Sequence, residues 1–261
     1  MENKERDAGA LLRNAAAQLR EELGELRLFS QKAAPSERRR LSPRADKDAA
    51  FADRNRLRMA RLAENMETCA ELMRGGRLER QNVDIVGMIA EICEESADLA
   101  EYLGVKLEFS CAEDKHICAV HAEYVRRLAY HLLSNALKVS PSGGRVRVRV
   151  AFLRPAYRLL LSVQDEGRGI EADGLSALFD GVGLGLFLCK RIAEGHGGFI
   201  TVRSEPGKGS EFTLNIPEER ENTLGFRQGG DFHVADGGVH PALLRLSDAL
   251  PVEAFRIANQ L

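Results

Sequence analysis

The chain has 261 residues, of which 44% are hydrophobic and 29% are charged, and its formal net charge is −2. This length buries a sizeable core in one large or two modest domains, and the near-neutral charge gives no indication of a nucleic-acid-binding or anionic-membrane surface. No apolar run approaches the roughly 20 residues of a membrane span, and the N-terminus lacks the apolar region of a signal peptide, so a cytoplasmic protein without a membrane span is expected.

The N-terminal region predicts two helices. Residues 7–33 contain no proline and carry apolar side chains at three- and four-residue steps, and a second helix is expected over residues 47–74, ending at two glycines. Residues 34–46 contain two prolines and break the pattern. Two such helices form an antiparallel hairpin, and a second copy of the chain would complete a dimeric four-helix bundle.

From residue 76 onward the pattern changes to alternating helices and strands. The expected helices cover residues 84–103 and 122–138, and the expected strands cover residues 105–110, 116–120, 145–153, 157–165, 199–203 and 211–216. The pattern predicts an α+β fold in which a two-layer α/β sandwich with a mixed sheet follows the hairpin. The domains are therefore expected at residues 7–75 and 76–217, with a linker and short helical tail of unassigned role over residues 218–261.

The helix over residues 122–138 carries three polar residues on one face: His131, Asn135 and Lys138. An amide oxygen at Asn135 is a hard ligand suited to Mg²⁺, and Lys138 supplies a point charge for a phosphate. Taken alone, this face is better explained as the solvated side of an amphipathic helix.

Two glycine-rich segments follow. Asp165 ends a strand and precedes Gly167 and Gly169, so its carboxylate can accept a hydrogen bond from an exocyclic amine such as that of adenine, although a polar turn has the same pattern. Farther on, a glycine turn begins a helix, and the backbone N–H groups at such a helix N-terminus can bind phosphates. The alternative is that the turn only caps the helix. This turn consists of Gly181, Gly183, Leu184 and Gly185. A dinucleotide fingerprint is excluded, because the turn follows a helical segment and no acidic residue stands at the required distance. His196 is assigned no catalytic role.

In this order, and with the ending KRIAEGHGGFITVRSEPGKGSEFTLNIP, residues 76–217 resemble the catalytic and ATP-binding domain of bacterial sensor histidine kinases, a GHKL-type ATPase with the Bergerat fold. The resemblance implies that Asn135 holds Mg²⁺, that Lys138 meets phosphate and that Asp165 binds the adenine amine. The glycines named above would shape the pocket and its lid. His131 stands where the family often has asparagine, in its active-site polar network, and is the candidate catalytic residue.

The N-terminal hairpin resembles the family's dimerisation and phosphoacceptor domain, but the acceptor is missing. In the segment AQLREEL, Ala17 occupies the position of the phosphorylated histidine, and Glu21 that of the residue that assists dephosphorylation. The first histidine anywhere in the chain is His116. Because a methyl group cannot take a phosphoryl group, self-phosphorylation of the hairpin is not expected.

The lid between Ile170 and Gly181 is short for the family, which predicts weaker coverage of ATP and less stabilisation of the transition-state charge.

Three functions remain open. The first is an ATP-binding signal-transduction protein that acts through a partner, either a response regulator or a protein that carries the missing histidine. The second is a catalytically inactive pseudokinase scaffold. The third, a serine-kinase-like anti-sigma factor, fits the ATP fold but leaves the hairpin unexplained.

Overall fold

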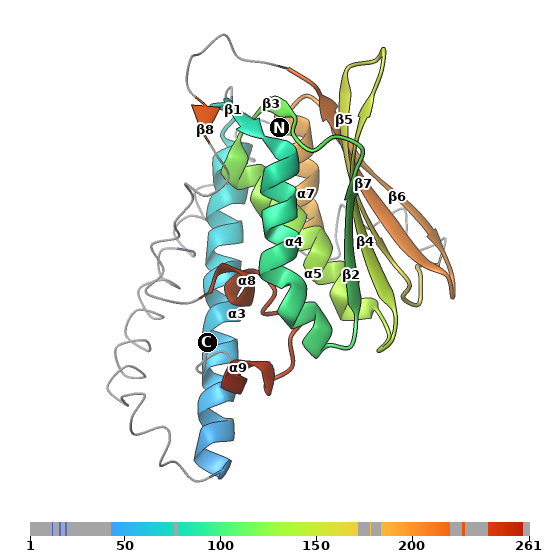
Figure 1. Ribbon diagram of the computed structural model, residues 1–261. Coiled ribbons are helices and arrows are strands. Elements are labelled where there is room, and N and C mark those ends of the chain that lie inside the picture. The colour runs from blue at the N-terminus through green and yellow to red at the C-terminus, as the bar shows by residue number, and fades with distance from the viewer. Residues whose placement is uncertain are drawn as a thin grey trace. The chain divides into compact units, whose positions relative to one another are not determined.

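The computed structural model describes residues 12, 16, 19, 43–75, 78–171, 178, 184–219, 226–227 and 240–257. The chain divides into two compact units (Figure 1). The helical unit comprises residues 1–75 and 239–261, and the sandwich unit comprises residues 76–238. The chain therefore leaves the helical unit once and returns to it. The functional domain boundaries inferred from the sequence stay a prediction.

The helical unit is built on α3 (Pro43–Met73). This helix begins four residues before the expected start, because proline is tolerated in the first helical turn, where its missing N–H has no partner to lose. Two short helices, α8 (Pro241–Arg245) and α9 (Ala254–Ile257), pack on α3. The expected first helix, residues 7–33, lies almost wholly outside the described residues, so the hairpin and its dimer stay predictions.

The sandwich unit contains a five-stranded sheet in the order β2-β4-β5-β7-β6. Its strands are β2 (Lys106–Cys111), β4 (Arg145–Leu153), β5 (Arg158–Asp165), β6 (Phe199–Glu205) and β7 (Gly209–Pro217). The β2–β4 pair is parallel and the other pairs are antiparallel, which confirms the mixed sheet.

A second, smaller sheet joins β3 (Ile117–Val120) to β1 (Gln81–Asp84) and β1 to β8 (Phe226–Arg227). The sequence analysis did not predict β1 or β8, because four and two residues are too short for an alternating pattern to be recognised. These strands lie next to the points where the described chain enters and leaves the sandwich unit.

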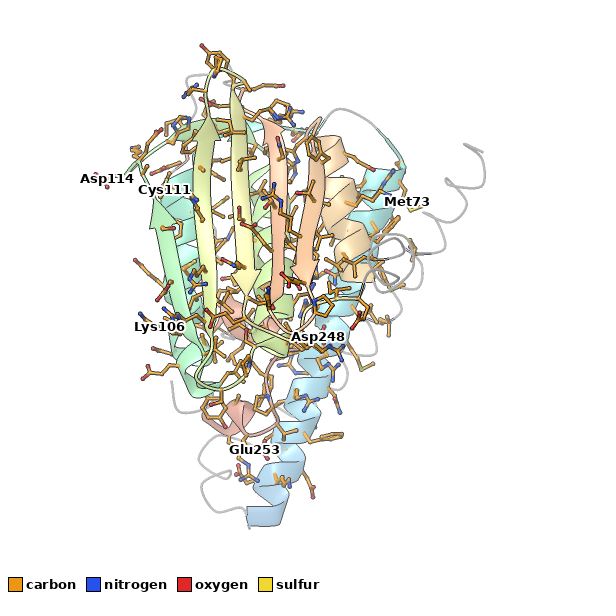
Figure 2. All side chains as sticks on the ribbon, turned by 90° about the vertical axis from the view of Figure 1, so that its right-hand side faces the viewer. Met73, Lys106, Cys111, Asp114, Asp248 and Glu253 are labelled. Carbon is orange, nitrogen blue, oxygen red and sulfur yellow. The ribbon has the colours of Figure 1, made fainter. Side chains whose placement is uncertain are left out.

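Among the described residues, three helices cover one face of the large sheet: α4 (Ile85–Tyr102), α5 (Ala122–Val139) and α7 (Leu184–Gly195) (Figure 1). In β4 the valines point into this layer, whereas Arg145 and Arg149 are exposed on the opposite face, which Figure 2 shows face-on. Each fully buried leucine or isoleucine between the layers stabilises the fold by about 1.5–3 kcal/mol. The two-layer α/β sandwich predicted from the sequence is therefore confirmed.

Within the described segments, no helix is both long enough and apolar enough to cross a lipid bilayer.

Candidate functional site

The candidate site depends on the position of α5, and His196 helps to fix the start of that helix. His196 Nε2 accepts a hydrogen bond of 3.0 Å from the backbone N–H of His121, the residue that caps α5. Its Nδ1–H donates to the Ile192 carbonyl at 2.7 Å, which sets the tautomer. The buried, neutral imidazole thus joins the end of α7 to the beginning of α5, and the role of His196 is structural.

The middle of α5 faces the first turn of α7. His131 is 4% exposed, and a Cβ atom added to Gly185 would lie 3.2 Å from His131 Nδ1. A side chain at Gly185 would therefore press on the imidazole. The structure brings these two predicted site residues together, and Leu184 begins α7 beside them.

Asn135 and Lys138 lie one and two turns after His131. Asn135 is half-buried and Lys138 is exposed, so the predicted polar face runs from the interior toward solvent. Among the described residues, neither side chain has a hydrogen bond or ion pair. A half-buried amide without a protein partner is available to a ligand, because leaving it unsatisfied costs free energy.

Asp165 ends β5 and is 2% exposed. Its Oδ1 atom accepts backbone N–H groups from Gly167 at 2.8 Å and from Ser210 at 3.2 Å. Burial raises the pKa of the Asp165 carboxyl above its ordinary value, and these two N–H donors oppose the rise. Within the described chain, Oδ2 accepts no hydrogen bond. One oxygen is thus held by the backbone, and the other remains for a donor such as an amine.

The two glycines after Asp165 allow close backbone contacts. A Cβ atom on Gly167 would lie 2.7 Å from the carbonyl oxygen of Val139, at the end of α5. Gly169 has a φ of +69°, and its Cβ atom would lie 2.1 Å from the Glu205 carbonyl oxygen. Gly167 therefore lets the loop after Asp165 approach α5, the helix that carries Asn135 and Lys138.

Three supporting residues were missed by the sequence analysis. Gly209 has a φ of +96°, and its Cβ atom would lie 2.0 Å from the Asp165 carbonyl oxygen. Ser204 Oγ accepts the Ile170 N–H at 2.9 Å and donates to the Gly209 carbonyl at 3.0 Å, and its other contact is Ser210 Oγ at 2.9 Å. The sequence EPGKGS indicates a turn, but only the β6–β7 register places that turn beside Asp165.

Some predicted positions lie outside the described residues: Gly181, Gly183 and Ala17. The same is true of residues 172–177 and 179–183, which include most of the expected lid. The short lid and the substituted acceptor position therefore stay predictions.

Comparison with known proteins identifies this domain. Residues 121–220 match the family described as histidine kinase-, DNA gyrase B- and HSP90-like ATPase. The sensor protein DivL of Caulobacter vibrioides is 33% identical over 152 residues, which cover 55% of this chain and 20% of DivL. The catalytic domain of histidine kinase ThkA has 19% identity and a TM-score of 0.51, and the match covers 55% of this chain and 100% of that chain.

A third match extends farther along the chain. Full-length ShkA in complex with AMPPNP has 21% identity and a TM-score of 0.59, and the match covers 78% of this chain and 46% of that chain. At these identities the structural matches establish the fold alone.

The sandwich unit is thus a GHKL-type ATPase domain. Residues 121–220 carry the ATPase domain that histidine kinases share with DNA gyrase B and HSP90, and the chain is similar to sensor proteins such as DivL. It spans 20% of the length of DivL and 44% of the length of the adaptive-response sensory kinase SasA of Synechococcus sp. strain JA-3-3Ab.

Proposed function

We propose that α5 and the loop after β5 form a pocket that binds Mg-ATP, with the adenine at Asp165 and the phosphates toward Asn135 and Lys138. The observation that carries the proposal is that the two carboxylate oxygens of Asp165 differ in their hydrogen bonding. Oδ1 is held by two backbone N–H groups, and Oδ2 has no partner in the described chain. A buried acceptor of this kind suits the exocyclic amine of adenine, which is a hydrogen-bond donor.

The donor set on α5 fits a magnesium ion. Mg²⁺ prefers oxygen ligands and is usually held by one or two protein groups, with water and substrate phosphates completing its shell. The Asn135 amide has the required oxygen, and no side-chain hydrogen bond occupies it among the described residues. When bound, the ion would neutralise phosphate charge, and the exposed Lys138 ammonium would add a second positive charge nearby. His131, buried against Gly185, would hold the first turn of α7 in place.

We further propose that the protein is a cytoplasmic signalling protein that acts as a homodimer and through a partner. The segment expected to form the hairpin has alanine at the expected acceptor position, and the first 115 residues contain no histidine. Phosphoryl transfer would therefore go first to a histidine of another protein, and a response regulator would be the partner downstream of that histidine. The matched family supports the kinase chemistry, and the sequence of the hairpin supports the need for a partner.

The same substitution favours a second candidate, a pseudokinase scaffold whose shape responds to ATP without phosphoryl transfer. Incubation with ATP and a panel of histidine-containing phosphotransfer proteins separates the two. Acid-labile phosphate on such a partner supports the kinase, whereas saturable ATP binding without labelling supports the scaffold.

The pocket itself is tested by calorimetric titration of ATP in the presence and absence of Mg²⁺. Asp165→Asn keeps an acceptor at Oδ1 but puts a donor toward the adenine amine, so we expect at least a tenfold loss of affinity, equivalent to about 1.4 kcal/mol. The matched control is Asp114→Asn, because Asp114 is exposed on the loop between β2 and β3 and makes no described contact (Figure 2). Equal affinities for the two variants would contradict the proposed pocket.

A further inference from the structure

The C-terminal segment, residues 240–257, packs on α3 through an apolar side. Phe255 and Leu250 are each 2% exposed, and Leu246 is fully buried. Both short helices of this segment contact α3. The segment therefore has the apolar anchors of a docked element.

The charges of the C-terminal segment match those of α3 in an antiparallel register. Arg245 pairs with Glu64, Asp248 pairs with Arg58 at 2.8 Å and with Arg61 at 3.3 Å, and Arg256 pairs with Asp46 at 3.3 Å. As the segment advances, its partners on α3 move toward the N-terminus of that helix. Along the C-terminal segment the charges are positive, negative and positive, and the residues of α3 that face them are negative, positive and negative. The charges therefore specify both the direction and the position of docking.

The interruption of the segment at Pro251 increases its reach along α3. Asp46 and Glu64 are separated by about 27 Å along the helix axis. A continuous helix from Arg245 to Arg256 would cover only about 16 Å. Because α8 ends at Arg245 and α9 begins at Ala254, the turns between them, which contain Pro251, let the segment extend along α3.

Where the described chain leaves the large sheet, it contacts the residue before β1 and a residue of β3. The Arg80 guanidinium contacts Glu219 Oε2 at 2.6 Å, and the Glu219 carbonyl accepts the Ala119 N–H at 2.7 Å. Beyond this point β8 pairs with β1. The entry into the sandwich unit and the exit from it therefore meet at the small sheet.

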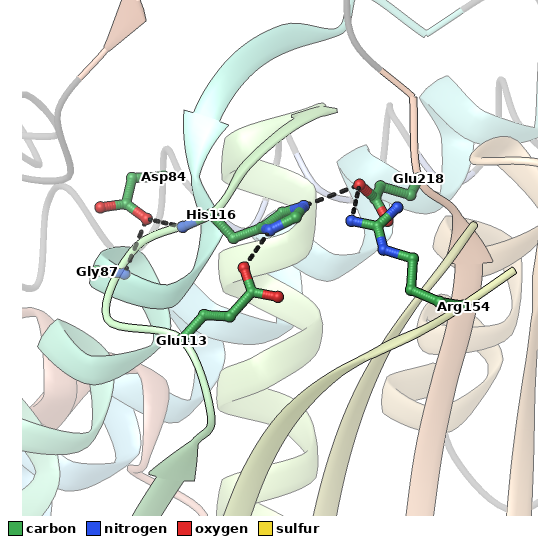
Figure 3. Close-up of polar contacts among 6 residues, drawn as sticks. All are labelled: Asp84, Gly87, Glu113, His116, Arg154 and Glu218. Atoms are coloured by element: carbon green, nitrogen blue, oxygen red, sulfur yellow. Dashed lines mark hydrogen bonds and ion pairs between the residues drawn. The ribbon is translucent and has the colours of Figure 1, made fainter.

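Glu218 adds a second attachment at the same exit. Figure 3 shows His116 between two carboxylates, with Nδ1 2.6 Å from Glu113 and Nε2 2.9 Å from Glu218. Arg154 also donates to Glu218, at 3.1 Å. His116 is buried and stacks on Phe152, with the ring centroids 3.7 Å apart. Twelve residues, 228–239, join this fixed exit to the C-terminal segment.

We propose that the C-terminal segment is an intramolecular strap. It docks on α3 of its own chain through the charge register and the apolar anchors, and it ties the exit of the ATP-binding domain to the helical unit. The domain is then connected to the helical unit at both ends. Its N-terminal end follows α3 directly, and its C-terminal end leads to the strap docked on α3. Displacement of the strap frees one end and widens the range of positions open to the domain. The proposal does not depend on nucleotide binding.

The test uses the full chain and reverses one strap charge. Asp248→Arg places a positive charge against Arg58 and Arg61, and we expect amide hydrogen exchange of residues 46–64 to accelerate by about tenfold and the radius of gyration from small-angle scattering to increase. The matched control is Glu253→Arg, an equal charge change on an exposed residue of the same segment, for which no change is expected (Figure 2). Adding Arg58→Asp and Arg61→Asp to Asp248→Arg restores opposite charges and should restore protection.

A second variant, Phe255→Asp, removes an apolar anchor without altering the charge pairs between Asp248 and α3. Protection of α3 that survives both Asp248→Arg and Phe255→Asp would overturn the docking. Faster exchange with an unchanged radius of gyration would overturn the tethering role. Calorimetric ATP titration of the same variants should give the affinity of the parent chain. If the parent chain itself does not bind ATP, the proposed pocket is refuted, and the strap is still judged by hydrogen exchange and scattering.

Discussion

Asp165 Oδ1 accepts the backbone N–H of Ser210, a residue 45 positions later in the chain, at 3.2 Å. This bond joins the end of β5 to the beginning of β7 and orients the carboxylate that we assign to adenine. The approach is close because Gly209, the residue before Ser210, has no side chain. The β6–β7 turn is therefore part of the candidate site, although it contributes only backbone and hydroxyl groups.

We expect Gly209→Ala to destabilise the protein more than Gly207→Ala does. Both glycines have positive φ, +96° and +79°, so both substitutions carry a backbone strain of about 1 kcal/mol or more. Only at Gly209 would the new Cβ atom meet another atom, the Asp165 carbonyl oxygen at 2.0 Å. Chemical denaturation should give an extra loss of at least about 2 kcal/mol for Gly209→Ala. Equal losses for the two variants would show that the turn moves freely away from Asp165.

Asp165→Asn should stabilise the nucleotide-free protein while weakening ATP binding. Burial raises the pKa of Asp165, so the folded protein binds this proton more tightly than the unfolded chain does. The stability contribution of that proton is present below the ordinary pKa of 3.8 and is lost as the pH rises through the folded value. At pH 7 a neutral amide avoids the cost of the buried charge, so the melting temperature should rise. A lower melting temperature at pH 7 would mean that the charged form is better solvated than its burial indicates.

The sequence predicts the large sheet well because its three central strands, β4, β5 and β7, alternate over eight or nine residues. In β4 each exposed or half-buried arginine is followed by a buried valine, and the helix over residues 122–138 has a clear apolar face. The position of Asp165 at a strand end, followed by glycines, is equally visible. These features depend on local periodicity, which a single sequence displays.

Other features depend on contacts between distant residues and leave no local pattern. The role of Gly209 requires the β6–β7 register, and the role of His196 requires α7 to end beside the start of α5. Asp248 pairs with Arg58 across 190 residues, so the docking of the C-terminal segment could not be inferred from its composition. The sequence analysis therefore found the residues proposed to meet ATP and missed most of the residues that hold them in place.

His196 should make the protein less stable in mild acid. Burial lowers the pKa of its imidazole from 6.5 to about 4, although the bond to the Ile192 carbonyl opposes the shift. The unfolded chain therefore takes up this proton first, so the stability contribution is present above pH 6.5 and is lost as the pH falls toward 4. The expected loss in the free energy of unfolding is at most about 3 kcal/mol, measured by urea denaturation across this range.

The control for this prediction is His196→Asn, which retains a donor for the Ile192 carbonyl but does not titrate. This variant should be less stable at pH 7, because the His121 N–H loses its acceptor. Its stability should, however, vary less between pH 6.5 and 4 than that of the parent chain. An unchanged pH dependence would assign the acid sensitivity to other groups.

The five cysteines should differ sharply in their reactivity toward alkylating reagents. All are free thiols, and among them only Cys111, at the end of β2, is partly exposed. Burial raises the pKa of Cys93 to about 12 and that of Cys118 to about 11, so neither forms thiolate at pH 8. Mass spectrometry after brief treatment with iodoacetamide should therefore find the label on Cys111, and Cys111→Ser should abolish rapid labelling. Early modification of Cys93, which is buried in α4, would instead show that this helix opens readily in the native protein.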